Sequence, residues 1–350
     1  MIIRCNLCLF LVLTVTLLGG CSSTPVAKKP NLENSVSTPK ADFFSDGLNS
    51  RYQWAIQNYE AGQYEKALKE LHSISMEGPE VERYELVDFF EGMSLFHLSR
   101  LPEATAKLEA FLKQAPKAYE AQEARMTLLR AYEMEKNWPK LVALAAESDN
   151  QSLYFENRAL LKLFWAEALN QLGEHSGAER VLSETNVLLN NLPEEYEGSG
   201  DGYDLRRELR GRYQWINLSN KAHDCSRTVV PAKGKASLLN QWADGYGECL
   251  VQASQDFFKD SRDLGAQWIE RSQMALFDAW KNWLAESHAR LEEKKGSLAL
   301  KREVDQRVKK SFARFLFLIQ EERKSFKNQP DKDKILRRLA QNVENLLSQQ

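Results

Sequence analysis

The sequence predicts an all-α protein in which a solenoid of helical hairpins precedes a bundle of long helices. Three observations lead to this prediction. Apolar residues recur at helical spacing over most of the 350 residues, whereas the alternation typical of strands is scarce. A pattern of small and apolar residues recurs every 37 residues in the N-terminal half. The C-terminal part holds long segments that each carry a single apolar stripe.

The composition is ordinary for a soluble globular protein, with 43% hydrophobic and 27% charged residues. The length allows two domains. The net charge of -2 creates no field that would attract nucleic acid, so no nucleic-acid partner is expected.

Residues 1–20 are expected to be an export signal rather than part of the fold. Arg4 gives a short positive start, and the apolar run from Leu7 to Leu18 is too short to favour a permanent membrane span. The run ends in Leu18-Gly-Gly-Cys21, which resembles the lipobox of bacterial lipoproteins. The resemblance implies cleavage before Cys21 and acylation of that residue. An ordinary signal peptide with a chance cysteine and a retained anchor helix are the alternatives.

The lipobox resemblance also implies a location in the bacterial cell envelope, with the membrane contacted through the lipid anchor. Ser22 follows the lipidated cysteine where enterobacterial lipoproteins kept in the inner membrane have Asp. By that analogy the protein is expected at the outer membrane, facing the periplasm. Residues 21–46 are rich in Ser, Thr, Pro and Lys and are expected to form a flexible tether.

Residues 47–190 are expected to form about four helical hairpins. In the first copy, Gly62 lies at the turn, Ala67 lies in the second helix, and Leu71 follows four residues later. The glycine permits the left-handed conformation that ends the first helix. The small alanine allows the two helices to approach closely, and Pro79 ends the second helix.

This spacing resembles the tetratricopeptide repeat, and it recurs along the chain. Turn positions fall at Gly62, Ser99, Lys136 and Gly173, each 37 residues after the last, where the family's usual period is about 34. The third copy departs from the family pattern, because it has Lys136 at the turn and Leu141 in place of the alanine. The residues expected to pack the repeats are Gly62, Ala67, Gly92, Ala104, Gly173 and Ala178.

The family resemblance implies that the first helix of each hairpin lines a groove that binds a partner protein. The side chains at these positions include aromatic and methionine residues, which suit an adaptable apolar contact with a peptide. They could instead pack against neighbouring helices. The groove residues expected from the four copies are Tyr52, Ile56, Tyr59, Glu60, Phe89, Met93, Phe96, His97, Met126, Arg130, Glu133, Met134, Leu163, Glu167, Asn170 and Gln171.

Residues 191–204 are acidic and rich in glycine, which predicts a loop. A calcium site there is conceivable, but the Asp-x-Asp-x-Asp-Gly order is absent and a solvated turn is favoured. Residues 205–350 are expected to form a C-terminal helical domain that either packs as a bundle or extends the solenoid.

Charge is uneven in the C-terminal domain. Residues 290–338 contain 16 Lys or Arg against 8 Asp or Glu, a net of +8. Either this is the solvated side of long helices, or it contacts anionic lipid headgroups or an acidic protein surface.

Cys225 and Cys249 are the two cysteines outside the export signal and the lipidation motif. Because an exported protein meets an oxidising compartment, we expect them to form a disulfide. Free thiols are one alternative. A metal pair with His223 and Asp224 is another, although the paired spacing of a zinc site is missing.

The sequence contains no nucleophile elbow, phosphate-binding loop, dinucleotide fingerprint or His-Glu-x-x-His motif. Glu286-Ser287 resembles the start of the lytic transglycosylase motif, but the glycine-rich and Gln-containing segments that should follow are missing. We therefore expect no catalysis, no cofactor and no small-molecule substrate.

The favoured hypothesis is a lipid-anchored envelope scaffold that holds a partner protein. The layout is similar to that of the repeat lipoproteins of outer-membrane β-barrel assembly and of those that organise peptidoglycan hydrolases. A structural subunit of a secretion, pilus or motility complex is the alternative, and an enzyme acting on peptidoglycan is a remote one.

Overall fold

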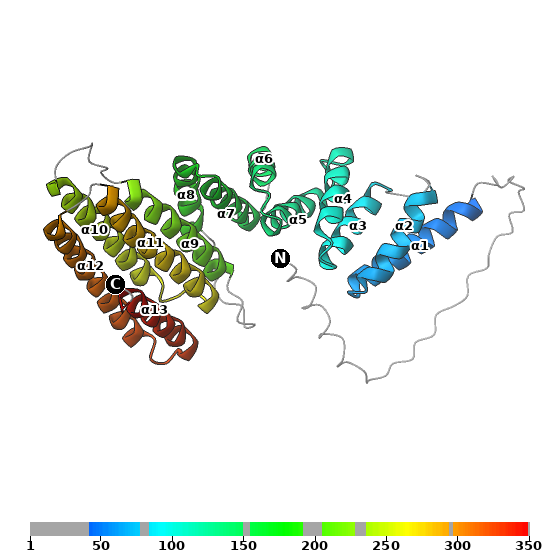
Figure 1. The fold of residues 1–350 in the computed structure, drawn as a ribbon. Helices are drawn as coiled ribbons and strands as arrows, with labels where there is room; N and C mark the ends of the chain where they lie inside the picture. The colour runs from blue at the N-terminus through cyan, green and yellow to red at the C-terminus, as the bar shows by residue number, and fades with distance from the viewer. Residues whose placement is uncertain are drawn as a thin grey trace, which may run out of the picture. The chain divides into compact units, whose positions relative to one another are not determined.

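The computed structural model describes residues 42–77, 84–149, 155–191, 205–227, 236–293 and 297–348 (Figure 1). Within these ranges every regular element is a helix, which confirms the predicted all-α class. None of these helices combines the length and the apolar character needed to cross a membrane. The expected export signal, Cys21, most of the tether and nearly all of the loop at 191–204 lie outside the described residues.

Eight helices of the N-terminal part form four consecutive hairpins. They are α1 (Asp42–Glu60) with α2 (Tyr64–Glu77), α3 (Glu85–His97) with α4 (Leu101–Gln114), α5 (Ala121–Met134) with α6 (Trp138–Ser148), and α7 (Phe155–Gln171) with α8 (His175–Asn190). The second helix of each hairpin also packs against the first helix that follows it. Stacking of each hairpin on the next one is the arrangement of a helical solenoid.

The four hairpin turns have the same backbone geometry. The central residue of each turn is left-handed, with φ of 74° at Gly62, 60° at Ser99, 56° at Lys136 and 78° at Gly173. The next residue donates its N–H to the carbonyl five positions back in all four turns, at 2.8–2.9 Å. This hydrogen bond closes the end of the first helix. The 37-residue register therefore extends through the third copy, although that copy lacks the glycine.

Small residues allow the helices of each hairpin to approach closely. Ala67, Ala104 and Ala178 are fully buried, and Leu141 occupies the same position in the third copy. In the second hairpin, a Cβ placed on Gly92 would lie 2.7 Å from Leu108 Cγ, so the backbone of α3 touches this side chain directly. These residues pack the hairpins as the sequence pattern indicates.

Five longer helices follow: α9 (Leu205–Arg227), α10 (Ala236–Asp260), α11 (Ala266–Glu293), α12 (Leu298–Ser325) and α13 (Pro330–Ser348). Each odd-numbered helix from α3 to α13 packs against the next odd-numbered one, and α10 packs against α12. The long helices thus form a two-layer bundle that also continues the row of hairpins. Residues Ser45–Gln350 are a single compact unit.

The C-terminal core is built around aromatic side chains. Trp242, Trp280 and Trp283 are fully buried, and Trp280 stacks on Phe315 with ring centroids 4.7 Å apart. Aromatic rings bury large apolar areas, so this cluster is a major source of stability.

A disulfide joins Cys225 of α9 to Cys249 of α10, with an S–S distance of 2.01 Å. The two cysteines are therefore neither free thiols nor metal ligands. No group of three or more His, Cys, Asp or Glu residues suited to a metal ion occurs in the described part of the chain.

Candidate functional site

Most of the large apolar side chains expected to line a groove lie inside the hydrophobic core. The buried ones are Tyr52, Phe89, Met93, Met126 and Leu163, each with less than a tenth of its surface exposed. They pack against neighbouring helices of the solenoid. This corrects their assignment to a partner-binding groove, because a buried side chain offers no surface to a partner.

Three more of the expected groove residues form an aromatic cluster. The His97 ring stacks on the Tyr64 ring, with centroids 4.2 Å apart. The ring centroids of Tyr59 and Phe96 each lie 6.0 Å from that of His97. Burial lowers the pKa of His97 from its ordinary value. Tyr59, Phe96 and His97 are half-buried, and their cluster joins the first two hairpins.

Five other residues expected in the groove are spread over three of the four hairpins. Ile56 is half-buried against the core, and Arg130 is half-buried. Glu60, Met134 and Gln171 are exposed. They do not combine into one accessible surface.

In the third and fourth hairpins, the expected groove contacts are made by the chain's own α9. Arg212 of α9 donates to Glu133 of α5 and to Glu167 of α7, both at 2.5 Å, and its guanidinium lies 4.0 Å from the centre of the Phe164 ring. Burial raises the pKa of Glu167, and Arg212 opposes this effect. Asn170 donates to the carbonyl oxygen of Ile216 in α9 at 3.3 Å. The side chains of Glu133, Glu167 and Asn170 therefore bind α9 of the same chain, at positions expected to contact a partner protein.

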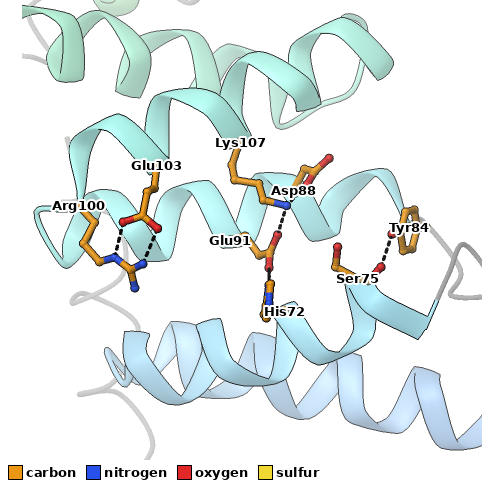
Figure 2. Close-up of polar contacts among 8 residues, drawn as sticks. All are labelled: His72, Ser75, Tyr84, Asp88, Glu91, Arg100, Glu103 and Lys107. Carbon is orange, nitrogen blue, oxygen red and sulfur yellow. Dashed lines mark hydrogen bonds and ion pairs between the residues drawn. The ribbon is translucent and has the colours of Figure 1, made fainter.

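An open hollow of about 880 Å³ lies on a different face, between α2, α3 and α4 (Figure 2). Helices α2 and α4 form its walls, and α3 forms its floor. Asp88, Glu91 and Leu95 of α3, and Leu98 directly after it, line the hollow. Helical spacing puts them on the side of α3 opposite Phe89. The other lining residues are Glu65, Leu68, Lys69, His72, Arg100, Glu103, Ala106, Lys107 and Ala110.

A buried carboxylate lies at the floor of the hollow. The Glu91 side chain is only 1% exposed. Lys107 Nζ approaches Glu91 Oε2 to 2.5 Å and Asp88 Oδ1 to 2.8 Å, and His72 Nδ1 lies 3.6 Å from Glu91 Oε1. Figure 2 shows His72 and Lys107 reaching Glu91 from the two walls. Burial disfavours the charge on Lys107, but its hydrogen bonds to Asp88 and Glu91 outweigh burial and raise its pKa.

The rest of the hollow combines apolar side chains with charges of both signs. Leu68 and Leu98 are half-buried and supply apolar surface. The small side chains of Ala106 and Ala110 leave the hollow open along α4. Arg100 pairs with Glu103 at one side (Figure 2). Such a surface can accept apolar side chains of a peptide between polar groups that hydrogen-bond to its backbone.

The sequence pattern did not single out these residues. The repeat motif marks the turns and the closely packed positions, whereas the hollow is lined by the outward sides of second helices. One signal was present: Ala106 and Ala110 are four residues apart and so form a small-residue strip on one side of α4.

No family model matches this sequence, and no curated protein matches it.

Proposed function

We propose that this chain is a cell-envelope scaffold that binds a segment of a partner protein in the hollow between α2, α3 and α4. The observation that carries the proposal is the hollow itself, whose volume of about 880 Å³ suits several side chains of a peptide. The Leu18-Gly-Gly-Cys21 motif supports a lipid anchor in a bacterial envelope.

The chemistry of the hollow favours a peptide as its ligand. At its floor, Lys107 pairs with both Glu91 and Asp88, which leaves a net charge of only about one negative unit. Lys107 and Asp88 are partly exposed beside the buried Glu91, so the floor offers hydrogen-bonding groups that suit the polar but uncharged backbone of a peptide. Apolar side chains of the same segment would contact Leu68 and Leu98, which are half-buried.

A substitution that fills the hollow tests the proposal. We expect Ala106→Phe to reduce partner capture by the full-length chain at least about ten-fold, because a bulky ring would occupy the space beside Lys107. The measurement is quantitative mass spectrometry of proteins crosslinked to the chain in intact envelopes.

The matched control is Ala143→Phe. Ala143 is the exposed equivalent of Ala106 in the third hairpin, 37 residues further on. We expect this variant to capture the same partners as the wild type. An unchanged partner set in the Ala106→Phe chain, with both variants folded, would contradict the proposal.

A further inference from the structure

The outer side of α12 carries a continuous row of exposed residues, which we call the cationic stripe. Its members follow helical spacing along the whole helix and occupy about one third of its circumference. All of them are exposed: Leu298, Ala299, Arg302, Gln306, Lys309, Lys310, Ala313, Phe317, Gln320 and Lys324. The opposite side of α12 is the core side, where Val304, Val308, Phe312, Phe315 and Ile319 are buried.

The cationic stripe contains four cations and no carboxylate. Within the described ranges, no acidic side chain pairs with Arg302, Lys309 or Lys310. Lys324 contacts Glu321, which lies at the edge of the stripe.

Three of the four other cations of α12 are paired with neighbouring helices, and the fourth, Lys301, is exposed outside the stripe. Arg307 pairs with Asp244 of α10, Arg314 with Glu248 of α10, and Arg323 with Asp333 of α13. These three arginines are used in packing the bundle. The four cations of the stripe, in contrast, are not used to join α12 to another helix.

Two large apolar side chains share the stripe with the cations. Leu298 is 67% exposed and Phe317 is 60% exposed. They are separated by about 28 Å along the helix axis, with Arg302, Lys309 and Lys310 between them. Because all of these side chains lie on one exposed side of α12, the cations can contact anionic groups of a surface that Phe317 and Leu298 also reach.

We propose that the cationic stripe lies on a membrane surface that contains anionic phospholipid. The complementary charge has to extend along most of α12, and a layer of anionic headgroups presents it without requiring a shaped partner. Phe317 and Leu298 then enter the headgroup region. This contact is separate from the hollow between α2, α3 and α4 and does not depend on the peptide bound there.

Photocrosslinking of the full-length chain tests the contact. A benzoylphenylalanine replaces Phe317, and the chain is reconstituted into phosphatidylcholine vesicles with or without phosphatidylglycerol. We expect lipid adducts with the anionic vesicles, in yields that fall at high salt because exposed charges are screened. The same photoreactive residue at Tyr119, which is 83% exposed in the hairpin region, is expected to give few lipid adducts.

A charge-reversal variant gives the second arm of the test. Each cation near an anionic surface changes binding by about five-fold, so Arg302→Glu, Lys309→Glu and Lys310→Glu together should reduce the lipid adduct more than ten-fold. The control reverses three exposed lysines elsewhere, Lys113, Lys117 and Lys259, which gives the same net charge. It should leave the adduct yield unchanged.

Three outcomes would overturn the proposal. Equal adduct yields on neutral and anionic vesicles would exclude charge recognition of lipid. An equal loss in the control variant would show only a net-charge effect. In intact envelopes, adducts at position 317 to protein alone would identify the stripe as a docking surface for an acidic protein.

Discussion

The closest helix contact in the second hairpin depends on the missing side chain of Gly92. A Cβ there would lie 2.7 Å from Leu108 Cγ and 3.2 Å from the Leu108 backbone nitrogen. The backbone atom cannot move without displacing α4. Gly92 is therefore required for close approach, not for a special backbone conformation.

We expect Gly92→Ala to lower the free energy of unfolding by up to about 2 kcal/mol. Overpacking costs about 1–3 kcal/mol, and the better helix propensity of alanine returns about 1 kcal/mol of it. Gly245→Ala is the matched control, because Gly245 lies inside α10 with nothing within 4 Å of the added Cβ. That change should stabilise the protein by about 0.5–1 kcal/mol. Urea unfolding measures both, and stabilisation of equal size in the two variants would contradict the packing role of Gly92.

At the scale of elements, the four hairpins repeat one turn with different residues. Gly62 and Gly173 adopt the left-handed conformation at little cost, whereas Ser99 and Lys136 have side chains there. A side chain costs about 1–2 kcal/mol in that conformation. The surrounding helix packing outweighs this cost, which is why the third copy keeps the fold despite its poor match to the repeat pattern.

The left-handed backbone at Ser99 and Lys136 predicts that glycine at either position would give a more stable protein. We expect Ser99→Gly and Lys136→Gly each to raise the free energy of unfolding by up to about 1 kcal/mol, because relief of the left-handed strain exceeds the added entropy of the unfolded chain. Gly62→Ser should lower it by a similar amount. Thermal unfolding of the three variants compares them directly. Destabilisation by both glycine substitutions would show that the side chains make compensating contacts.

The sequence predicted the hairpins well but did not predict which side chains of the first helices are exposed, for a physical reason. Turn and close-packing positions require particular residue types, so Gly62, Ala67 and Ala104 reveal them. An apolar residue on a first helix carries no such information. Helix α3 packs against α2, α4 and α5, so side chains on several of its sides are buried. Helical periodicity could not separate Phe89, which is core, from a residue facing a partner.

At the scale of the whole molecule, α9 connects the hairpins to the long helices. Leu209 and Ile216 of α9 pack with α7 and α8, whereas Leu218 and Cys225 belong to the C-terminal core. The acidic, glycine-rich segment at 191–204 suggested a boundary between two regions. The composition of a segment predicts whether its own backbone forms a loop, but it does not predict contacts between the helices on either side. Those contacts are made by side chains such as Arg212, 45 and 79 residues away from its partners.

The ion pairs of Arg212 join α9 to α5 and α7, and their contribution to the free energy of unfolding can be measured. Removing one partner of a buried ion pair typically costs about 3–5 kcal/mol, because the remaining charge is left without compensation. We therefore expect Arg212→Ala to destabilise the protein by an amount of this order. Increased hydrogen exchange should appear in α9 and in the facing parts of α5 and α7. Gln214→Ala, a change on the same helix at a half-buried residue that contacts Asp260, is the control and should have little effect.

The pH dependence of the Arg212→Ala variant separates charge from packing. Burial already raises the pKa of Glu167, and without Arg212 this pKa should rise further. A carboxyl group whose pKa is higher in the folded protein than in the unfolded one, where it is about 4.3, binds protons preferentially in the folded state. Such a carboxyl group does not destabilise the folded protein below its unfolded pKa. The destabilisation grows as the pH rises from the unfolded pKa through the folded pKa. The deficit of Arg212→Ala relative to the wild type should therefore be smaller at about pH 5 than at about pH 7. A deficit that is the same at both pH values would mean that α9 is held by packing against Phe164 and not by the ion pair.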